Sequence, residues 1–202
     1  AAGTSATYTW NSQALDLPEQ YRIRCLGESG SDLLIGTWVG NNITQNKIAD
    51  IYPWNRVDDS FGLPIKMGDN GIQAMISIGN LNYFFSGIRG NLNVTDGSTV
   101  KNLLTEIPQH MWPDDQQFEV SPAQMIFHDG KILFGNKNET ASENYIFSYD
   151  INNDVLAVEN TATIGTATLQ LGGLLSVGRR DYLFGWDNGS SAGMDLAQGG
   201  RV

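Results

Sequence analysis

The sequence predicts an all-β fold of the β-propeller type: a repeat of four-stranded antiparallel blades, with about three and a half blades in a partial ring. The first observation is a landmark, Leu33-Leu34-Ile35-Gly36, with counterparts at 83–86, 132–135 and 182–185. Each copy places three large apolar residues before a small one, and the copies are 50, 49 and 50 residues apart. The second observation is that 23 glycines and six prolines separate short apolar runs, as in chains with many turns. A strand-rich repeat of about fifty residues is typical of propeller blades.

The repeat divides the chain into an N-terminal arm or linker, residues 1–20, and a propeller segment, residues 21–202. The expected blades cover about 21–67, 71–108 and 122–160, followed by an incomplete blade at 168–202. Propellers close with about four to eight blades, and the open ends of a repeat stack expose apolar faces. We therefore expect another chain, or the remainder of a longer polypeptide, to complete the ring. A β-sandwich or an open β-solenoid is the alternative architecture.

Apolar runs between turn residues locate four strands in each of the first two blades. In the first blade they are expected at 23–26, 33–39, 48–52 and 61–66. In the second blade they are expected at 74–78, 81–85, 91–95 and 100–107. Pro64 lacks a backbone donor, which places the last strand of the first blade at an exposed edge. Asp96-Gly97 predicts a hairpin in the second blade.

The third blade is expected to contain strands at 124–127, 131–135, 144–149 and 155–159. Asp129-Gly130 predicts the hairpin between the first two of these strands. The fourth blade is expected to have strands at 174–177 and 182–186, and only the start of a third strand at 194–196. Residues 109–121, between the second and third blades, form the longest irregular stretch.

Composition excludes several classes of function. A net charge of −10 argues against nucleic acid as a partner, because binding to phosphates requires an excess of Lys and Arg. The chain has no run of about 18 apolar residues, so we expect no membrane insertion. Cys25 is the only cysteine, which excludes an intrachain disulfide and favours a buried structural thiol. Residues 1–5 do not resemble an intact signal peptide, which leaves the compartment open.

Catalytic and metal-binding patterns are weak, so we expect a protein that is not an enzyme and has no cofactor or metal. Residues 189–193 match the Gly-x-Ser-x-Gly nucleophile elbow, but both histidines, His110 and His128, precede them. A hairpin loop is the expected structure there. Residues 150–154 have the oxygen spacing of a calcium loop, but Val155 stands where that loop needs glycine. We interpret them as a hairpin joining two strands.

Tryptophans beside Asp, Asn or Arg in loops are the candidate ligand contacts. An indole ring can stack on a sugar while carboxylates and amides bind its hydroxyl groups. Packing of these tryptophans between blades is the competing interpretation. The candidate contact residues are Trp54, Arg56, Asp58, Trp112, Asp114, Trp186 and Asp187.

Two stretches of sequence carry a resemblance to a known class of proteins. Residues 90–97 (Gly-Asn-Leu-Asn-Val-Thr-Asp-Gly) and 49–57 (Ala-Asp-Ile-Tyr-Pro-Trp-Asn-Arg-Val) resemble propeller-like virion proteins of tailed bacteriophages. The resemblance extends over most of residues 21–186, while the signatures of WD40 and kelch repeats are lacking. It implies a structural tail or nozzle component of a multi-subunit particle, with no catalytic residue to transfer.

Three functional hypotheses follow. The favoured one is a non-enzymatic structural or interaction module, located in a virion or otherwise extracellular, whose partners are other protein subunits or the rest of a longer chain. The second is a carbohydrate- or receptor-binding propeller that contacts a glycan through the tryptophans. The third is a fragment of a propeller-type enzyme acting on glycosides, with catalytic carboxylates partly outside this sequence.

Overall fold

The computed structural model describes residues 17, 21–39, 49–69, 71–108, 111, 118, 120–135, 143–163, 170–177, 181–187 and 194–199. Apart from Leu17, the predicted N-terminal arm lies outside these residues, and so does most of the irregular stretch at 109–121. Within the described residues the regular elements are β-strands, and one short 3-10 helix, η2 (Pro122–Gln124), precedes the third sheet. The predicted all-β class is therefore confirmed.

The described strands form four separate antiparallel sheets, each built from strands that follow one another in the chain. The first sheet contains β1 (Arg22–Ser29), β2 (Asp32–Trp38), β3 (Asp50–Asn55), β4 (Ser60–Phe61) and β5 (Ile65–Lys66). The second contains β6 (Ile72–Ile78), β7 (Leu81–Ser86), β8 (Asn91–Thr95) and β9 (Val100–Leu104). The third contains β10 (Met125–His128), β11 (Lys131–Gly135), β12 (Glu143–Asp150) and β13 (Val155–Thr163). The fourth contains β14 (Gln170–Val177), β15 (Asp181–Asp187) and β16 (Met194–Gly199).

The repeat predicted from the landmark tetrapeptides is thus present, because each landmark lies on the second strand of its sheet. Several predicted strand ends differ from the structure: β3, predicted at 48–52, covers 50–55, β9 ends at 104 and not 107, and β13 extends to 163 and not 159. The predicted strand 61–66 differs most. It is divided into β4 and β5, which both pair with β3 and are separated by residues 62–64. Pro64 lies in this break. Because residues 62–64 are not part of a strand, no hydrogen bond between strands is lost through its missing N–H.

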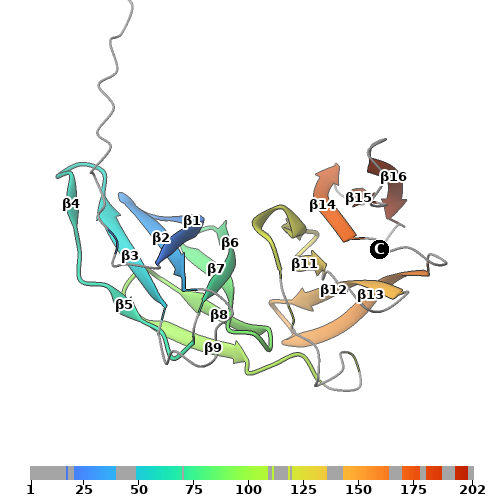
Figure 1. The fold of residues 1–202 in the computed structure, drawn as a ribbon, viewed down its shortest axis with the longest axis horizontal. Helices are drawn as coiled ribbons and strands as arrows, with labels where there is room; N and C mark the ends of the chain where they lie inside the picture. Colours follow the sequence, from blue (N-terminus) through green and yellow to red (C-terminus); the bar gives the residue numbers. More distant parts are fainter. Residues whose placement is uncertain are drawn as a thin grey trace, which may run out of the picture.

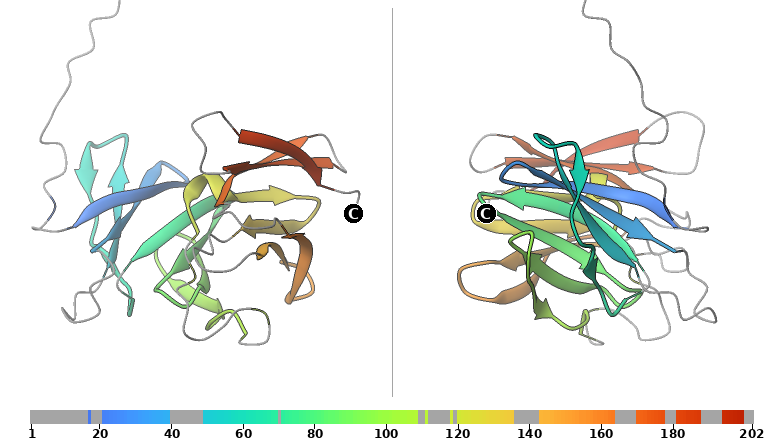
Figure 2. Two further views of the ribbon diagram at one scale, coloured as in Figure 1. Left: turned by 45° about the vertical axis from the view of Figure 1, so that its right-hand side comes forward. Right: turned by 90° about the vertical axis from the view of Figure 1, so that its left-hand side faces the viewer.

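The sheets follow chain order across the molecule, from β1–β5 through β6–β9 and β10–β13 to β14–β16 (Figures 1 and 2). Neighbouring sheets meet through their first strands: β1 packs beside β6, β6 beside β10, and β10 beside β14. Each inner sheet is therefore covered on both faces, which explains why its second strand is apolar at successive positions.

The second sheet shows this two-sided burial residue by residue. Phe84 joins the cluster shared with the first sheet, which includes Leu34 and Ile51. Its chain neighbours Tyr83 and Phe85 point to the opposite face and join the cluster shared with the third sheet. Alternate residues of one strand thus serve two interfaces, as the period of two in a β-strand requires.

The two predicted Asp-Gly turns are confirmed, and a further short turn lies at Gly79. Asp129 and Gly130 both have positive φ, 46° and 80°, as in the two-residue hairpin turn that joins β10 to β11. Gly97, with φ of 95°, lies in the loop between β8 and β9. Gly79, with φ of 61°, joins β6 to β7. The turn residues therefore set the register in which the apolar faces meet the neighbouring sheets.

Cys25 is buried on β1 in the cluster between the first two sheets, as the sequence predicts. Burial raises the pKa of its thiol to about 12, and the nearby charge of Arg24 only partly opposes this. At pH 8, on the order of one molecule in 10,000 would carry the reactive thiolate.

We expect Cys25 to resist 5,5′-dithiobis(2-nitrobenzoic acid) in the native protein and to react fully in guanidinium chloride. The absorbance of the released thiolate measures both states in one experiment. Complete reaction of the native protein within the mixing time would contradict the buried position of Cys25.

Candidate functional site

The structure brings together one of the predicted ligand-contact groups, Trp54, Arg56 and Asp58, at the end of β3 and in the turn that follows. The indole of Trp54 stacks on Phe61 with ring centroids 6.4 Å apart, and its Nε1 donates to Asp59 Oδ1 at 3.1 Å. Trp54 therefore already has an aromatic partner and a hydrogen-bond acceptor within its own sheet.

Arg56 is held by the hairpin between β1 and β2. Its guanidinium forms an ion pair with Glu28 at 3.2 Å and donates to the backbone carbonyls of Gly30 and Ser31. Asp58 is exposed in the turn. These contacts give Arg56 a structural role in fixing two loops of the first sheet.

Two other predicted contact residues belong to a different sheet from Trp54. Trp186 and Asp187 lie at the end of β15 in the fourth sheet. Trp112 and Asp114 lie outside the described residues, as do His110 and residues 188–193 with their Gly-x-Ser-x-Gly pattern. Glycan binding by these tryptophans stays a prediction, and quenching of tryptophan fluorescence on a glycan panel would test it.

The candidate calcium loop forms the predicted hairpin between β12 and β13. Asp150 Oδ1 accepts from the backbone N–H groups of Asn152 and Asn153, at 2.9 and 3.1 Å. The Tyr149 hydroxyl donates to Asp154, and Asp154 has a positive φ of 57°. The side-chain oxygens of Asp150 and Asp154, which have the sequence spacing of calcium ligands, thus accept hydrogen bonds that stabilise the turn. Among the described residues, no group of three His, Cys, Asp or Glu side chains is placed to hold a metal ion.

The stretch 90–97, which carries the resemblance to virion proteins, has structural roles in the second sheet. Asn91 Nδ2 donates to Asp69 Oδ2 at 2.9 Å, and Ser86 donates to the same carboxylate. Asn93 Nδ2 donates to Ser86 Oγ at 2.9 Å, which extends the network across the strand pair. These side chains tie the turn before β6 to the middle of the sheet.

A buried glutamine that the sequence analysis did not single out fixes the connection to the third sheet. Gln73 Nε2 donates to the carbonyls of Gly87 and Phe118, and its Oε1 accepts from Val120 N at 2.7 Å. Three polar groups of the backbone are thereby satisfied inside the protein, where leaving them unpaired would be costly. Gln73 thus anchors the segment before η2 on β6.

His128 is the described histidine, and it is buried where the third sheet meets the fourth. Its Nδ1 lies 2.8 Å from Ser176 Oγ, and its ring meets the ring of Tyr182 edge-on at 5.8 Å. Within the described residues, Nε2 has no hydrogen-bond partner. The contacts of His128 with Ser176 and Tyr182 therefore link the third sheet to the fourth.

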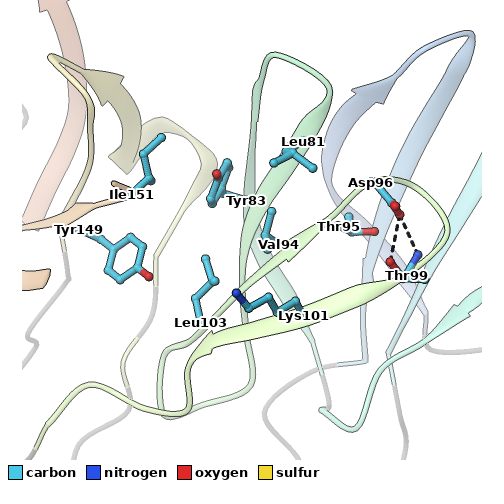
Figure 3. Close-up of a pocket in the computed structure, with 10 residues that line it drawn as sticks. All are labelled: Leu81, Tyr83, Val94, Thr95, Asp96, Thr99, Lys101, Leu103, Tyr149 and Ile151. Atoms are coloured by element: carbon cyan, nitrogen blue, oxygen red, sulfur yellow. Dashed lines mark hydrogen bonds between the residues drawn. The ribbon is translucent and has the colours of Figure 1, made fainter. Parts of the chain in front are cut away.

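A cavity of about 360 Å³ lies between the second and third sheets (Figure 3). The cross-strand row Tyr83, Val94 and Lys101 forms one wall, because Tyr83 pairs with Val94 and Val94 with Lys101. Tyr149 and Ile151, from the end of β12 and the turn after it, lie on the other side. The cavity opens beside the apolar cluster that joins the two sheets.

Asp96 lies at one end of this cavity and caps the loop between β8 and β9 (Figure 3). Its Oδ1 accepts hydrogen bonds from the backbone and side chains of Thr99 and Ser98. The backbone hydrogen bond from Thr99, followed by those from Ser98, holds the pKa of Asp96 well below its usual range. Asp96 is therefore ionised at all but strongly acidic pH.

A carboxylate whose pKa is lower in the folded than in the unfolded chain stabilises the fold above the unfolded pKa, about 3.9 for Asp. This contribution is lost as the pH falls below that value. Asp96→Asn keeps the hydrogen-bond acceptor and removes the titration. We expect urea unfolding to show a smaller loss of stability between pH 5 and pH 2 in the variant, and an equal loss in both proteins would contradict this assignment.

The two outermost sheets expose apolar side chains on the faces that point away from their neighbours. On β1, Cys25 and Gly27 face the second sheet, so Leu26 points outward, and its exposed fraction is 53%. On β14, Ser176 meets His128 of the third sheet, so Leu175 points outward, with 61% exposed. We call these two surfaces the outer faces of the first and fourth sheets.

In the described part of the chain, no helix is both long and apolar enough to cross a membrane. The sequence matches no model of a protein family and no curated protein.

The structure aligns with solved structures, among them the following three. The computationally designed Ika4 protein aligns with a TM-score of 0.59 at 12% identity, over 92% of this chain and 94% of that chain. Oligopeptidase B from Leishmania major aligns with a TM-score of 0.49 at 10% identity, over 88% of this chain and 24% of the peptidase. The computationally designed Ika8 protein aligns with a TM-score of 0.41 at 14% identity, over 83% and 56% of the two chains. Of these, the likeness to Ika4 shows that the arrangement of four sheets also occurs in a solved protein of similar extent, and it concerns the fold alone.

Proposed function

We propose that this chain is a non-enzymatic structural and interaction module of a β-propeller. Its outer faces bind other protein subunits, or the remainder of a longer chain, and thereby complete a ring of blades. The observation that carries the proposal is the exposure of Leu26 and Leu175 on the faces where a further sheet would pack.

The inner sheets supply the physical argument. Both faces of the second sheet are buried against its neighbours through apolar clusters, as Leu34 and Phe84 are between the first two sheets. The outer faces repeat this apolar pattern: Phe61 is 39% exposed beside Trp54 on the first sheet, and Val177 is 41% exposed on the fourth. Terminal units of a repeat stack need a polar cap or a partner for such faces. An apolar partner surface therefore fits them best.

Light scattering coupled to size-exclusion chromatography tests the proposal. We expect the isolated chain, which has a mass of 22.1 kDa, to associate in a concentration-dependent way. Leu175→Asp should shift it towards the mass of one chain, because a charge would be buried in the interface. Val57→Asp is the matched control, since Val57 is exposed in the turn between β3 and β4 and should leave association unchanged. A stable wild-type monomer at all concentrations would contradict the proposal.

The resemblance of residues 90–97 and 49–57 to virion proteins of tailed bacteriophages supports a more specific setting, a subunit of a viral tail. Mass spectrometry of purified particles tests it: peptides of this chain should be present in stoichiometric amounts. Absence of these peptides from the particles would contradict the proposed role in a viral tail. It would not affect the proposal of an interaction module, which the light-scattering experiment tests.

A further inference from the structure

We propose that the cavity between the second and third sheets binds a small amphipathic anion, a molecule with an apolar ring-containing body and one carboxylate or sulfonate group. Binding at this site is separate from the association of the outer faces. The proposal rests on the size of the cavity, its apolar walls, and two polar groups that have no hydrogen-bond or ion-pair partner among the residues that the structure describes.

The size of the cavity fits a small molecule. Its volume of about 360 Å³ lies near the lower end of the range of about 300–1,000 Å³ that is usual for ligand sites. The lining residues come from β7, β8 and β9 on one side and from the end of β12 and its turn on the other (Figure 3). A ligand there would contact both sheets at once.

The walls favour an apolar body with a ring. Leu81, Val94, Leu103 and Ile151 supply aliphatic surface to the cavity. Tyr83 and Tyr149, also on the wall, add aromatic rings, which prefer stacked or edge-to-face contact with another ring. Most of the binding free energy would therefore come from removing apolar ligand surface from water.

Two polar groups are left to bind the charged end of the ligand. Within the described residues, the Lys101 ammonium makes no ion pair or hydrogen bond, and in Figure 3 it extends along its strand towards Leu103. The hydroxyl of Tyr83, a residue only 8% exposed, also has no hydrogen-bond partner among the described residues. This hydroxyl is not one of the fully buried atoms without a partner, so it is open to the cavity and can donate to a ligand oxygen there.

The other polar groups of the lining are already engaged. The Tyr149 hydroxyl donates to Asp154, and Thr99 donates to Asp96. The Asp96 carboxylate at the far end accepts four hydrogen bonds from its own turn, which spread its charge. The free donors are thus a cation and a hydroxyl, which together select a negatively charged oxygen group.

Fluorescence of 8-anilinonaphthalene-1-sulfonate, an aromatic anion, tests the proposal on the full 202-residue chain. We expect saturable enhancement at one site. Lys101→Met should weaken binding about tenfold or more, and Tyr83→Phe about threefold or more, because each removes one donor to the anionic group. Benzoate should displace the probe at lower concentration than benzyl alcohol, which has a similar body but no charge.

Two control variants separate the cavity from other surfaces. Arg22→Met removes an exposed cation from β1, outside the cavity, and should leave the affinity within about twofold of the wild type. Leu175→Asp alters the outer face of the fourth sheet and should likewise leave it unchanged. Because Lys101 is exposed on β9, its variant should keep the wild-type melting temperature.

Binding that is lost in Leu175→Asp but kept in Lys101→Met would overturn the proposal. Equal displacement of the probe by benzoate and benzyl alcohol would overturn it as well. Absence of saturable probe binding would also overturn it.

Discussion

Replacing Phe134 by alanine should lower the free energy of unfolding by about 3–5 kcal/mol, the usual loss for a buried aromatic residue. Phe134 is fully buried on β11 at the centre of the cluster between the second and third sheets. Its ring lies 4.5 Å from that of Phe85 and 5.6 Å from that of Phe147, between centroids. The loss is a large part of the total stability of a typical domain, about 5–15 kcal/mol.

Urea unfolding with linear extrapolation measures the effect of Phe134→Ala. Phe127→Ala provides the matched control, because Phe127 lies on β10 of the same sheet and is 37% exposed. The control should lose about 1 kcal/mol or less, since part of its ring already contacts water. Equal losses in the two variants would show that the ring cluster is not the main contact between these sheets.

Phe134 also shows why the fold could be predicted from the sequence. It is the third residue of a landmark tetrapeptide. In each inner sheet the second strand, which contains the landmark, is covered by a neighbouring sheet on both faces. Short turns such as Asp129-Gly130 then fix the pairing of consecutive strands. The spacing of apolar residues locates the strands, and the turn residues show which consecutive strands pair. Both features are local in the sequence, so the four sheets could be predicted without knowledge of contacts between distant residues.

The cavity could not be predicted in this way, because it depends on how two sheets are placed relative to each other. Lys101 and Tyr149 are far apart in sequence, and neither belongs to a recognisable motif. Gln73 gave no signal for the same reason: its side chain binds the backbone of Phe118 and Val120, more than forty residues away. Trp54 is a candidate because Arg56 and Asp58 are near it in sequence, but in the structure its indole N–H donates to Asp59, which follows them in the same turn.

Gly90→Ala should destabilise the protein by about 2–4 kcal/mol, from backbone strain and crowding together. Gly90 has a φ of 76°, in the left-handed region. A Cβ at this position would lie 2.6 Å from Phe118 Cδ1 and 2.9 Å from Ile107 Cγ1, both in fully packed side chains. The turn that contains Gly90 also binds the segment beyond it, since Phe118 N donates to Ile88 O at 2.9 Å.

Gly79→Ala separates the two causes in the same denaturation experiment. Gly79 has a similar φ of 61°, but a Cβ there would meet nothing within 4 Å. It should therefore lose only about 1 kcal/mol, the backbone contribution alone. Adding Phe118→Leu to Gly90→Ala should then cost less than the sum of the single changes, because the smaller side chain makes room for the new methyl group. If the two losses of stability are strictly additive, crowding by Phe118 is not the reason for a glycine at position 90. The positive φ of Gly90 would then be the sole reason.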